Sequence, residues 1–226
     1  MPHEIDKFLP YPLPPWEHDF QTLAVHCEVD TASLIPFIPP PLELASDQIQ
    51  LAVMRFDCQV PTRLYYDAAV IVLVRYQNTV GGFWPFAYNS TDQAMSGTRE
   101  IWGYNMKLAD IALERDTEFA EGQVSRLDKT VMSVSMNIEE KKFETTDMFP
   151  RLFLKHIPNA KTSGGIQTTV IRMNTRPEIS SHITGSGKVS FEPSPDDPLY
   201  RIKIKKTLGA TFTTGHQILP WGEIIS

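Results

Sequence analysis

The segment from Gly97 to Asp110, GTREIWGYNMKLAD, gathers side chains that could do acid–base or amine chemistry. Arg99 and Glu100 are adjacent opposite charges. A carboxyl such as that of Glu100 would have a raised pKa if it were partly buried, and it could then exchange a proton near neutrality. Lys107 carries an amine that could attack a carbonyl group. Only the neutral amine does so, and an unperturbed lysine, with a pKa of about 10.4, is almost entirely protonated at neutral pH.

Each of these residues also has a structural interpretation. Arg99 and Glu100 could form an ion pair that holds the segment together, and Lys107 could be a surface lysine or the partner of a carboxylate. Adjacent side chains point about 180° apart on a strand and about 100° apart on a helix. If Met106 faces a pocket, we therefore expect Lys107 to face away from it, unless the backbone shifts locally.

Another carboxyl and several aromatic residues surround the neighbouring apolar segments. Asp67 begins the run DAAVIVLVRYQ, and its pKa would be raised if it were partly buried. The aromatic candidates for a substrate pocket are Tyr65, Trp84, Trp102 and Tyr104. They could simply pack in the core, or they could line an apolar pocket that removes water from a reacting group. Both interpretations hold if the segments converge.

Known cofactor and metal motifs are missing from the sequence. The chain has six histidines, and none of them has the close HxH or HExxH spacing of a metal site. No GxSxG, GxGxxG or phosphate-binding loop occurs. We therefore expect no metal and no cofactor. Cys27 and Cys58 both lie in apolar runs, so we expect reduced core residues rather than a disulfide framework.

Composition and charge narrow the function classes. The chain has 226 residues and a formal net charge of -6, which argues against nucleic acid as a partner because phosphate binding needs a basic surface. The first residues lack the pattern of a secretory signal, and no apolar run reaches the roughly 18 residues of a membrane helix. We expect a soluble, cytoplasmic protein that binds a small molecule and does not associate with a membrane.

Alternation of apolar and polar residues predicts a mainly β chain with a few short helices. The expected strands are residues 20–29, 49–58, 67–77, 118–127, 131–138, 151–157, 166–173, 179–191, 199–204 and 208–219. Short helices are expected after the cap Asp30 and, with Ser90 or Thr91 as cap, over residues 91–101. A turn is expected at Gly81-Gly82. So many strands favour closure into a barrel or a clam-like pair of sheets.

The domain organisation is expected to be simple. Residues 1–19 are rich in proline and predict an extended arm, because proline lacks the N–H that a helix or a central strand needs. Residues 20–226 show no repeat, linker or low-complexity segment, so we expect one domain there.

Several motifs, taken in order, resemble the acetoacetate decarboxylase family. The segment from Arg99 to Leu108 is similar to the family's Gly-Arg-Glu motif followed by an aromatic residue, proline, two lysines and leucine. IPPPLEL at 38–44 and LKHIPN at 154–159 resemble two further family motifs, and residues 208–225 resemble the last strands. The resemblance covers nearly the whole chain. It implies an antiparallel β-barrel or cone with flanking helices, and assembly into a homo-oligomer.

The family's chemistry is amine catalysis on a β-keto acid. The first lysine of the family's pair forms a Schiff base with the ketone, and the iminium accepts the electrons released as carbon dioxide leaves. In this sequence that position is Met106, which cannot form an imine. Lys107 matches the second lysine, and Asn105 replaces the proline before the pair.

Three further family positions are changed in the same register. A family glutamate becomes Asp67, another acidic pocket residue becomes Ala52, and an arginine associated with the substrate carboxylate falls near Phe20. The resemblance therefore implies a more apolar pocket that is less suited to a small keto acid.

We expect a divergent enzyme of specialised, polyketide-like metabolism that acts on an apolar oxo-compound without an imine, by cyclisation, dehydration or a related lyase or isomerase step. Asp67 and Glu100 would do the acid–base work, and Tyr65, Trp84, Arg99, Trp102, Tyr104 and Met106 would bind the substrate. Two alternatives remain open: a Schiff-base decarboxylase or aldolase-dehydratase that uses Lys107, and a non-catalytic protein that binds an apolar ligand.

Overall fold

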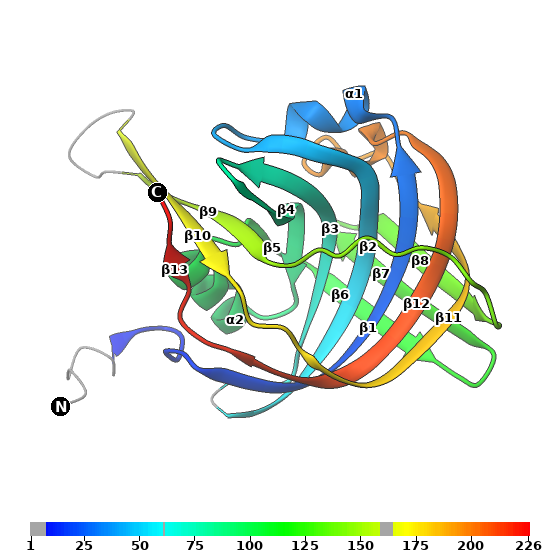
Figure 1. Cartoon of the computed structure of the whole chain (residues 1–226). Coiled ribbons are helices and arrows are strands. Elements are labelled where there is room, and N and C mark those ends of the chain that lie inside the picture. Colours follow the sequence, from blue (N-terminus) through cyan, green and yellow to red (C-terminus); the bar gives the residue numbers. More distant parts are fainter. Residues whose placement is uncertain (1–7, 61, 159–164) are drawn as a thin grey trace.

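The computed structural model describes residues 8–60, 62–158 and 165–226 (Figure 1). The first seven residues of the predicted proline-rich arm lie outside this range. The arm was expected to run to residue 19, but the first strand already begins at Trp16. Within the described residues, no helix is both long enough and apolar enough to cross a membrane.

The described residues form one sheet of 13 strands. The strands are β1 (Trp16–Val29), β2 (Glu43–Val60), β3 (Tyr65–Tyr76), β4 (Thr79–Asn89), β5 (Met106–Leu108), β6 (Asp110–Arg115), β7 (Phe119–Arg126), β8 (Lys129–Ile138), β9 (Arg151–Pro158), β10 (Ile166–Met173), β11 (Glu178–Ser190), β12 (Ile204–Leu219) and β13 (Glu223–Ile224). Their order is β13-β10-β9-β4-β3-β2-β1-β12-β11-β8-β7-β6, and β5 pairs with β4. The prediction of a mainly β chain is confirmed.

The sheet curls until β6, β7 and β8 cross the face of β1, β2 and β3 (Figure 1). The two end strands of the described sheet, β6 and β13, do not pair with each other, so the curled sheet has the cone shape of the prediction without a closed ring of hydrogen bonds. The larger apolar core lies inside the curl and includes Leu23, Val53, Val70 and Phe212. Burial of this core removes a larger area of apolar surface from water than burial of any other part of the described chain, and it is the main stabilising contribution to the fold.

The opposite face of the same strands carries a second buried cluster. On β1, Leu23 and Val25 belong to the first core, whereas Phe20 and Ala24 belong to the second cluster. This division follows from the two-residue period of a strand. On β3, residues of both faces are buried, which explains why its sequence is an almost unbroken apolar run.

Two short α-helices connect the strands. In α1 (Thr31–Leu34), Asp30 caps the first turn by accepting from the backbone N–H of Ala32. In α2 (Asp92–Gly97), Thr91 is the cap, as one of the two predicted alternatives. A π-helical turn, Thr98–Trp102, follows α2 directly. The helices predicted after Asp30 and over residues 91–101 are therefore present, the second one as two successive elements.

Two local predictions are wrong. Gly81 and Gly82 lie inside β4, and the turn is formed earlier by Gln77, which has a positive φ of 51°. A Cβ atom on Gly82 would stand 2.5 Å from the carbonyl oxygen of Met148, so glycine is needed for a close approach rather than for a turn. The strand expected at 199–204 is a 3₁₀ turn, Pro198–Arg201, with β12 starting afterwards.

Candidate functional site

Met106 and Lys107 lie on opposite faces of β5. The strand pairs in parallel with β4, with Met106 opposite Ala87 and Lys107 opposite Tyr88. Met106 is fully buried in the second apolar cluster. Lys107 points the other way, and its Nζ donates hydrogen bonds to Asp197 Oδ1 at 2.8 Å and to the carbonyl oxygen of Asp196 at 2.7 Å. The amine is thus held in an ion pair on the side of the sheet away from the second cluster.

The turn before β5 fixes this orientation. Gly103 has a φ of 86°, a left-handed conformation that glycine adopts without strain. Arg99 Nη1 donates to the carbonyl oxygen of Met106 at 2.7 Å. Glu100 is exposed, and its Oε2 accepts a hydrogen bond from Tyr11 Oη at 2.7 Å. Arg99 and Glu100 therefore bind other groups of the protein rather than each other.

A row of small side chains leads across the sheet to Met106. Ala24, Ala52, Ala69 and Ala87 lie opposite one another on β1 to β4, and Ala87 pairs with Met106. All five residues belong to the second cluster. Because alanine carries only a methyl group, this row leaves space above the sheet that larger side chains would fill.

Asp67 lies in the next row on the same face of β3. It is opposite Met54 on β2 and Asn89 on β4, and Asn89 Nδ2 donates to Asp67 Oδ1 at 2.6 Å. Only 4% of Asp67 is exposed. Burial raises its pKa to about 8, although the Asn89 hydrogen bond and the charge of Arg151 lower it. Asp67 is therefore a protonated, neutral acid at pH 7.

Arg151 is a pocket residue that the sequence analysis did not single out. It is the first residue of β9, and its guanidinium lies over the rings of Phe149, at 4.8 Å from the centroid, and Trp84, at 5.7 Å. Burial raises the pKa of Tyr104, whereas the charge of Arg151 and its hydrogen bond to the Tyr104 side chain lower this pKa. An arginine directly after Phe149-Pro150 and before the apolar run LFL at 152–154 was the available sequence signal.

The aromatic candidates belong to the same cluster as Met106. The Tyr104 ring packs against Phe153, with ring centroids 3.8 Å apart, and against Trp84, at 4.9 Å. Trp84 is 2% exposed, and its Nε1 has no hydrogen-bond partner among the described residues. Trp102 Nε1 donates to the carbonyl oxygen of Pro220 at 2.8 Å, which gives Trp102 a structural role at the edge of the site.

Tyr65 forms a buried pair with His18, another residue that the sequence analysis did not select. A hydrogen bond of 3.0 Å joins Tyr65 Oη and His18 Nε2. Burial, with a smaller contribution from His216, lowers the pKa of His18 to about 4, so the imidazole is neutral at pH 7. Its Nδ1 has no partner within the described part of the chain.

A cavity of ≈ 420 Å³ opens over the alanine row. Its floor is formed by side chains of β1, β2, β3 and β4, including Phe20, Ala24, Ala52 and Ile71. Its cover is the segment 145–149, part of the long connection that crosses β1 to β3 in Figure 1. Gln50 Nε2 holds this cover by donating to the carbonyl oxygen of Thr146 at 3.2 Å. Volumes of this order are typical of small-molecule sites.

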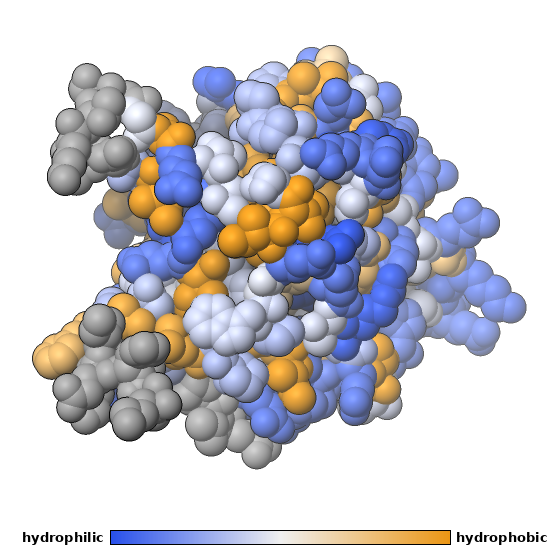
Figure 2. Space-filling view, turned by 60° about the vertical axis from the view of Figure 1, so that its left-hand side comes forward, coloured by the Kyte–Doolittle hydropathy of each residue, from blue (hydrophilic) through white to orange (hydrophobic). Residues whose placement is uncertain are grey.

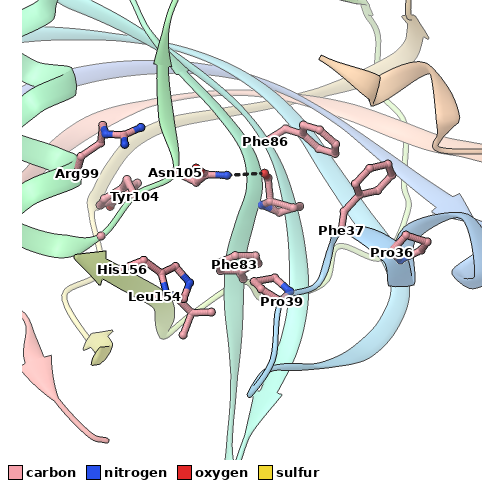
Figure 3. Close-up of a pocket in the computed structure, with 12 residues that line it drawn as sticks. Pro36, Phe37, Pro39, Phe83, Phe86, Arg99, Tyr104, Asn105, Leu154 and His156 are labelled. Carbon is pink, nitrogen blue, oxygen red and sulfur yellow. Dashed lines mark hydrogen bonds between the residues drawn. The ribbon is translucent and has the colours of Figure 1, made fainter. Parts of the chain in front are cut away.

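A second hollow, of ≈ 430 Å³, lies on the other side of the turn before β5 (Figure 3). Arg99, Tyr104 and Asn105 line one side of it, and Phe37 and Pro36 line the other (Figure 3). Asn105 Nδ2 donates to the carbonyl oxygen of Pro85 at 3.2 Å, shown as the dashed line. Asp67 and Met106 line neither hollow. Several residues of the cluster that contains Met106 line the cavity over the alanine row, whereas among the described residues of that cluster only Tyr104 lines the second hollow, so we regard the first cavity as the candidate site.

The comparisons with known proteins agree with this fold. The family model of acetoacetate decarboxylase matches residues 1–225. The chain belongs to the acetoacetate decarboxylase family. It is 25% identical over 204 residues to the acetoacetate decarboxylase of Acidiphilium cryptum (strain JF-5), an alignment that covers 87% of this chain and 82% of that one.

Two solved structures of the acetoacetate decarboxylase fold are similar over almost the whole chain. The acetoacetate decarboxylase of Legionella pneumophila has a TM-score of 0.86 and 22% identity, covering 96% of this chain and 90% of that one. The second structure is that of the enduracididine biosynthesis enzyme MppR, complexed with the condensation product of pyruvate and imidazole 4-carboxaldehyde. It has a TM-score of 0.83 and 14% identity, and the match covers 96% of this chain and 91% of that one. At these identities the structures establish the fold alone.

Most of the positions selected through the acetoacetate decarboxylase resemblance meet at this site. Phe20 and Ala52 line the cavity, and Met106 lies in the surrounding cluster with Tyr65, Trp84, Trp102 and Tyr104. Asp67 lies beside them, on the same face of β3 as the cavity residue Ile71. Arg99, Glu100 and Lys107 lie outside this group and bind other parts of the protein. Among the described residues, no three His, Cys, Asp or Glu side chains come together as a metal site would require.

Proposed function

We propose that this chain is an enzyme that acts on an apolar oxo-compound by acid–base catalysis at Asp67, without forming an imine. The observation that carries the proposal is a buried carboxyl with a pKa of about 8, on the sheet face that forms the apolar floor of a cavity and that also carries Met106 at the family's lysine position. Perturbed carboxyl groups at the edge of a cavity are typical of catalytic acids and bases.

In the proposed reaction, the carbonyl oxygen of the substrate reaches Asp67 past Met54 and Arg151, which both line the cavity. The protonated carboxyl donates its hydrogen bond and then its proton to this oxygen. The carboxylate that results is stabilised by the charge of Arg151 and takes a proton from the carbon next to the carbonyl. This exchange converts the ketone to its enol, which is the entry to a dehydration, cyclisation or isomerisation.

The shape of the cavity supports a substrate larger than a three- or four-carbon keto acid. Ala52 and Phe20 stand where the family has polar groups, so the floor is apolar, and the volume of ≈ 420 Å³ holds a ring system or a medium-length chain. MppR, a biosynthesis enzyme complexed with a condensation product, has the same fold. That resemblance supports a reaction other than decarboxylation, in specialised metabolism.

The Schiff-base alternative at Lys107 has less support. Its amine is on the opposite face of β5 from Met106 and is bound to Asp197, whose side chain is fully buried. To act as a nucleophile in the cavity, Lys107 would have to break this ion pair, and its side chain would have to move to the opposite face of β5. The alternative of a non-catalytic binding protein leaves the buried Asp67 without a role, although burying a carboxyl is costly.

The test is turnover of a panel of apolar 3-oxo acids and polyketide-like 1,3-diketones, followed by mass spectrometry. We expect at least one compound to be dehydrated, cyclised or isomerised, and the Asp67→Asn variant to lose roughly 10²-fold or more of that rate. Asp110→Asn, which removes an exposed carboxyl on β6, is the matched control and should keep the rate. Turnover that survives in Asp67→Asn would exclude the proposed role of Asp67.

Borohydride trapping distinguishes this proposal from imine chemistry. The wild-type chain should gain no covalent adduct when it is reduced in the presence of a β-keto acid. The Met106→Lys variant would place an amine in the buried cluster, where desolvation lowers its pKa, and it should be trapped. An adduct on Lys107 of the wild-type chain would instead support the Schiff-base alternative.

A further inference from the structure

One end of the cavity presents a cation without a carboxylate partner and a buried N–H without an acceptor. The Arg151 guanidinium lines the cavity, and within the described residues no carboxylate lies close enough to form an ion pair with it. The indole N–H of Trp84, another residue of the cavity wall, is buried and has no acceptor in the described part of the chain. Arg151 shares a hydrogen bond with the Tyr104 side chain, which leaves its charge without a carboxylate. A buried N–H without an acceptor is costly, so this N–H and the cation beside it favour a ligand that supplies negative oxygen atoms.

Aromatic rings hold this cation in place. The guanidinium carbon of Arg151 is 4.8 Å from the centroid of the Phe149 ring and 5.7 Å from that of the Trp84 ring. Phe149 belongs to the cover of the cavity, and Trp84 to its sheet wall. A planar guanidinium fixed between rings is prepared for a bidentate contact with a carboxylate, which loses less side-chain entropy than a free arginine would.

The neighbouring groups leave the charge of Arg151 available. Asp67 is an acid whose pKa this charge lowers, but it keeps its own proton at neutral pH because burial raises that pKa to about 8. The other arginine of the cavity wall, Arg176, already binds Asp147 through two hydrogen bonds of 3.2 and 2.6 Å. His26 is neutral and is joined to Thr211 at 3.1 Å. Arg151 is thus the one cation without an acidic partner among the described residues of the cavity wall.

The part of the cavity over β2 and β3 is suited to an apolar group, whereas polar residues such as Thr211 and Gln217 line its side toward β12. Phe20, Met54, Phe56 and Ile71 line the wall, and Ala24 and Ala52 leave space above the floor. We propose that the cavity binds an amphipathic carboxylic acid, whose carboxylate pairs with the guanidinium of Arg151 while its apolar body lies over Ala24 and Ala52. This inference rests on the proposed function and narrows its substrate from an apolar oxo-compound to an apolar oxo acid.

The position of this subsite differs from that of the carboxylate-binding arginine implied by the family resemblance. The resemblance to the family places a carboxylate-binding arginine on β1, at a position occupied here by Phe20. The proposed anchor comes from β9, which joins the sheet beside β4. A substrate held there has its polar group beside Asp67 and its apolar group toward β1, so Arg151 is a specificity-determining residue rather than a group that transfers protons.

The test compares the binding of 4-phenylbutanoate and its uncharged analogue 4-phenylbutanamide by calorimetry at pH 7. The two probes have the same apolar body, and only the first has a carboxylate. We expect the acid to bind about 10-fold more tightly or better, because a hydrogen bond to a charged group is far stronger than one to a neutral group. In Arg151→Met this preference should disappear while the binding of the amide stays within about 3-fold.

Arg176→Met is the matched control, since it removes the same charge from the same cavity at an arginine that already has a partner, and it should keep the preference for the acid. Arg151→Lys, which keeps the charge, should keep a reduced preference and covers the case in which the methionine variant does not fold. Equal binding of acid and amide to the wild-type chain would overturn this inference and leave the proposed function standing. Binding of neither probe would also overturn this inference, whereas the proposed function is overturned only by the turnover experiment.

Discussion

Asp67 and Arg151 determine the electrostatics of the candidate site at the scale of single residues. The carboxyl is neutral because its burial outweighs both the Asn89 hydrogen bond and the nearby guanidinium. The guanidinium supplies a positive charge that has no carboxylate partner among the described residues. A neutral acid next to an unpaired cation can release its proton when a substrate needs it, because the carboxylate left behind would then have a partner.

The raised pKa of Asp67 predicts a specific dependence of stability on pH. Its pKa is about 8 in the folded chain and 3.8 in the unfolded chain. Between these values the unfolded chain has released the proton and the folded chain still holds it, so wild-type stability falls as the pH rises from about 4 to about 8. Asp67→Asn cannot ionise, and its amide oxygen can still accept from Asn89.

We therefore expect the Asp67→Asn variant to gain stability relative to the wild-type chain as the pH rises. The gain between pH 4.5 and pH 8 should reach several kcal/mol, because each pKa unit corresponds to about 1.4 kcal/mol. Urea unfolding at the two pH values measures this difference. The control Asp110→Asn should show no such trend. If the difference in the free energy of unfolding between Asp67→Asn and the wild-type chain were the same at both pH values, the pKa of about 8 assigned to Asp67 would be contradicted.

At the scale of elements, β5 is held by charges on one face and by apolar packing on the other. Asp197 accepts hydrogen bonds from Lys107 and Arg126, and also from Tyr88 Oη at 3.0 Å. Burial raises the pKa of Asp197, but Lys107, followed by Arg126 and Tyr88, outweighs burial and holds this pKa below its usual range. The carboxylate therefore links β4, β5, β7 and the 3₁₀ turn before β12.

Removal of the charge of Asp197 should destabilise the fold. In Asp197→Asn, two cations lose their common partner in a place where the acid is fully buried. We expect a loss of about 2–3 kcal/mol in the free energy of unfolding, below the 3–5 kcal/mol of a fully buried pair because Lys107 and Arg126 stay partly hydrated. Chemical denaturation measures it. Glu223→Gln, which breaks the exposed pair with Arg172, should cost much less, and equal costs would contradict this assignment.

The left-handed turn at Gly103 is the second feature that orients β5. A Cβ atom there would stand 2.7 Å from the backbone of Lys155, and the φ of 86° disfavours other residues. We expect Gly103→Ala to lose about 2 kcal/mol or more of stability, and to lose activity because Met106 and Tyr104 would shift. Thermal unfolding and turnover are the measurements. Ser96→Ala, on α2, is the control, and a Gly103→Ala variant as stable as that control would contradict the role of the turn.

Local sequence patterns were sufficient for most of the long strands and for the opposed directions of Met106 and Lys107, because both follow from the two-residue period of a strand. The list of expected strands omitted β4, β5, β6 and β13. They were insufficient for Arg151 and Asp197, whose importance depends on partners far apart in the sequence. Arg151 meets Trp84 only because β9 joins the sheet beside β4. Gly82 was misread as a turn residue because the close approach of Met148 has no local signal.

At the scale of the whole molecule, the open end of the sheet carries exposed apolar residues. Figure 2 turns the side of β9, β10 and β13 toward the viewer and shows separate hydrophobic patches among hydrophilic residues. Ile157, Ile166, Trp221 and Ile224 are exposed on or next to these strands. Unpaired strand edges and exposed apolar side chains favour contact with another chain.

Self-association therefore remains a prediction of both the sequence and the surface. Light scattering coupled to size-exclusion chromatography should give a mass that is a multiple of 25.6 kDa. Trp221→Asp, which puts a charge on this surface at a residue that is 60% exposed, should shift the mass toward one chain. Asp110→Asn on β6, at the other end of the sheet, should leave the mass unchanged. A wild-type chain that elutes as a monomer would contradict the prediction.

The account depends most directly on the protonation state of Asp67. The measurement is a pH titration of the aspartate side-chain carboxyl carbons by ¹³C NMR between pH 5 and pH 10, with the Asp67→Asn variant used to assign the resonance. We predict one resonance that titrates near pH 8 in the wild-type chain and is missing from the variant. A spectrum in which the Asp67 carbon is already in its ionised position at pH 5 would contradict the proposal of a neutral acid at this site.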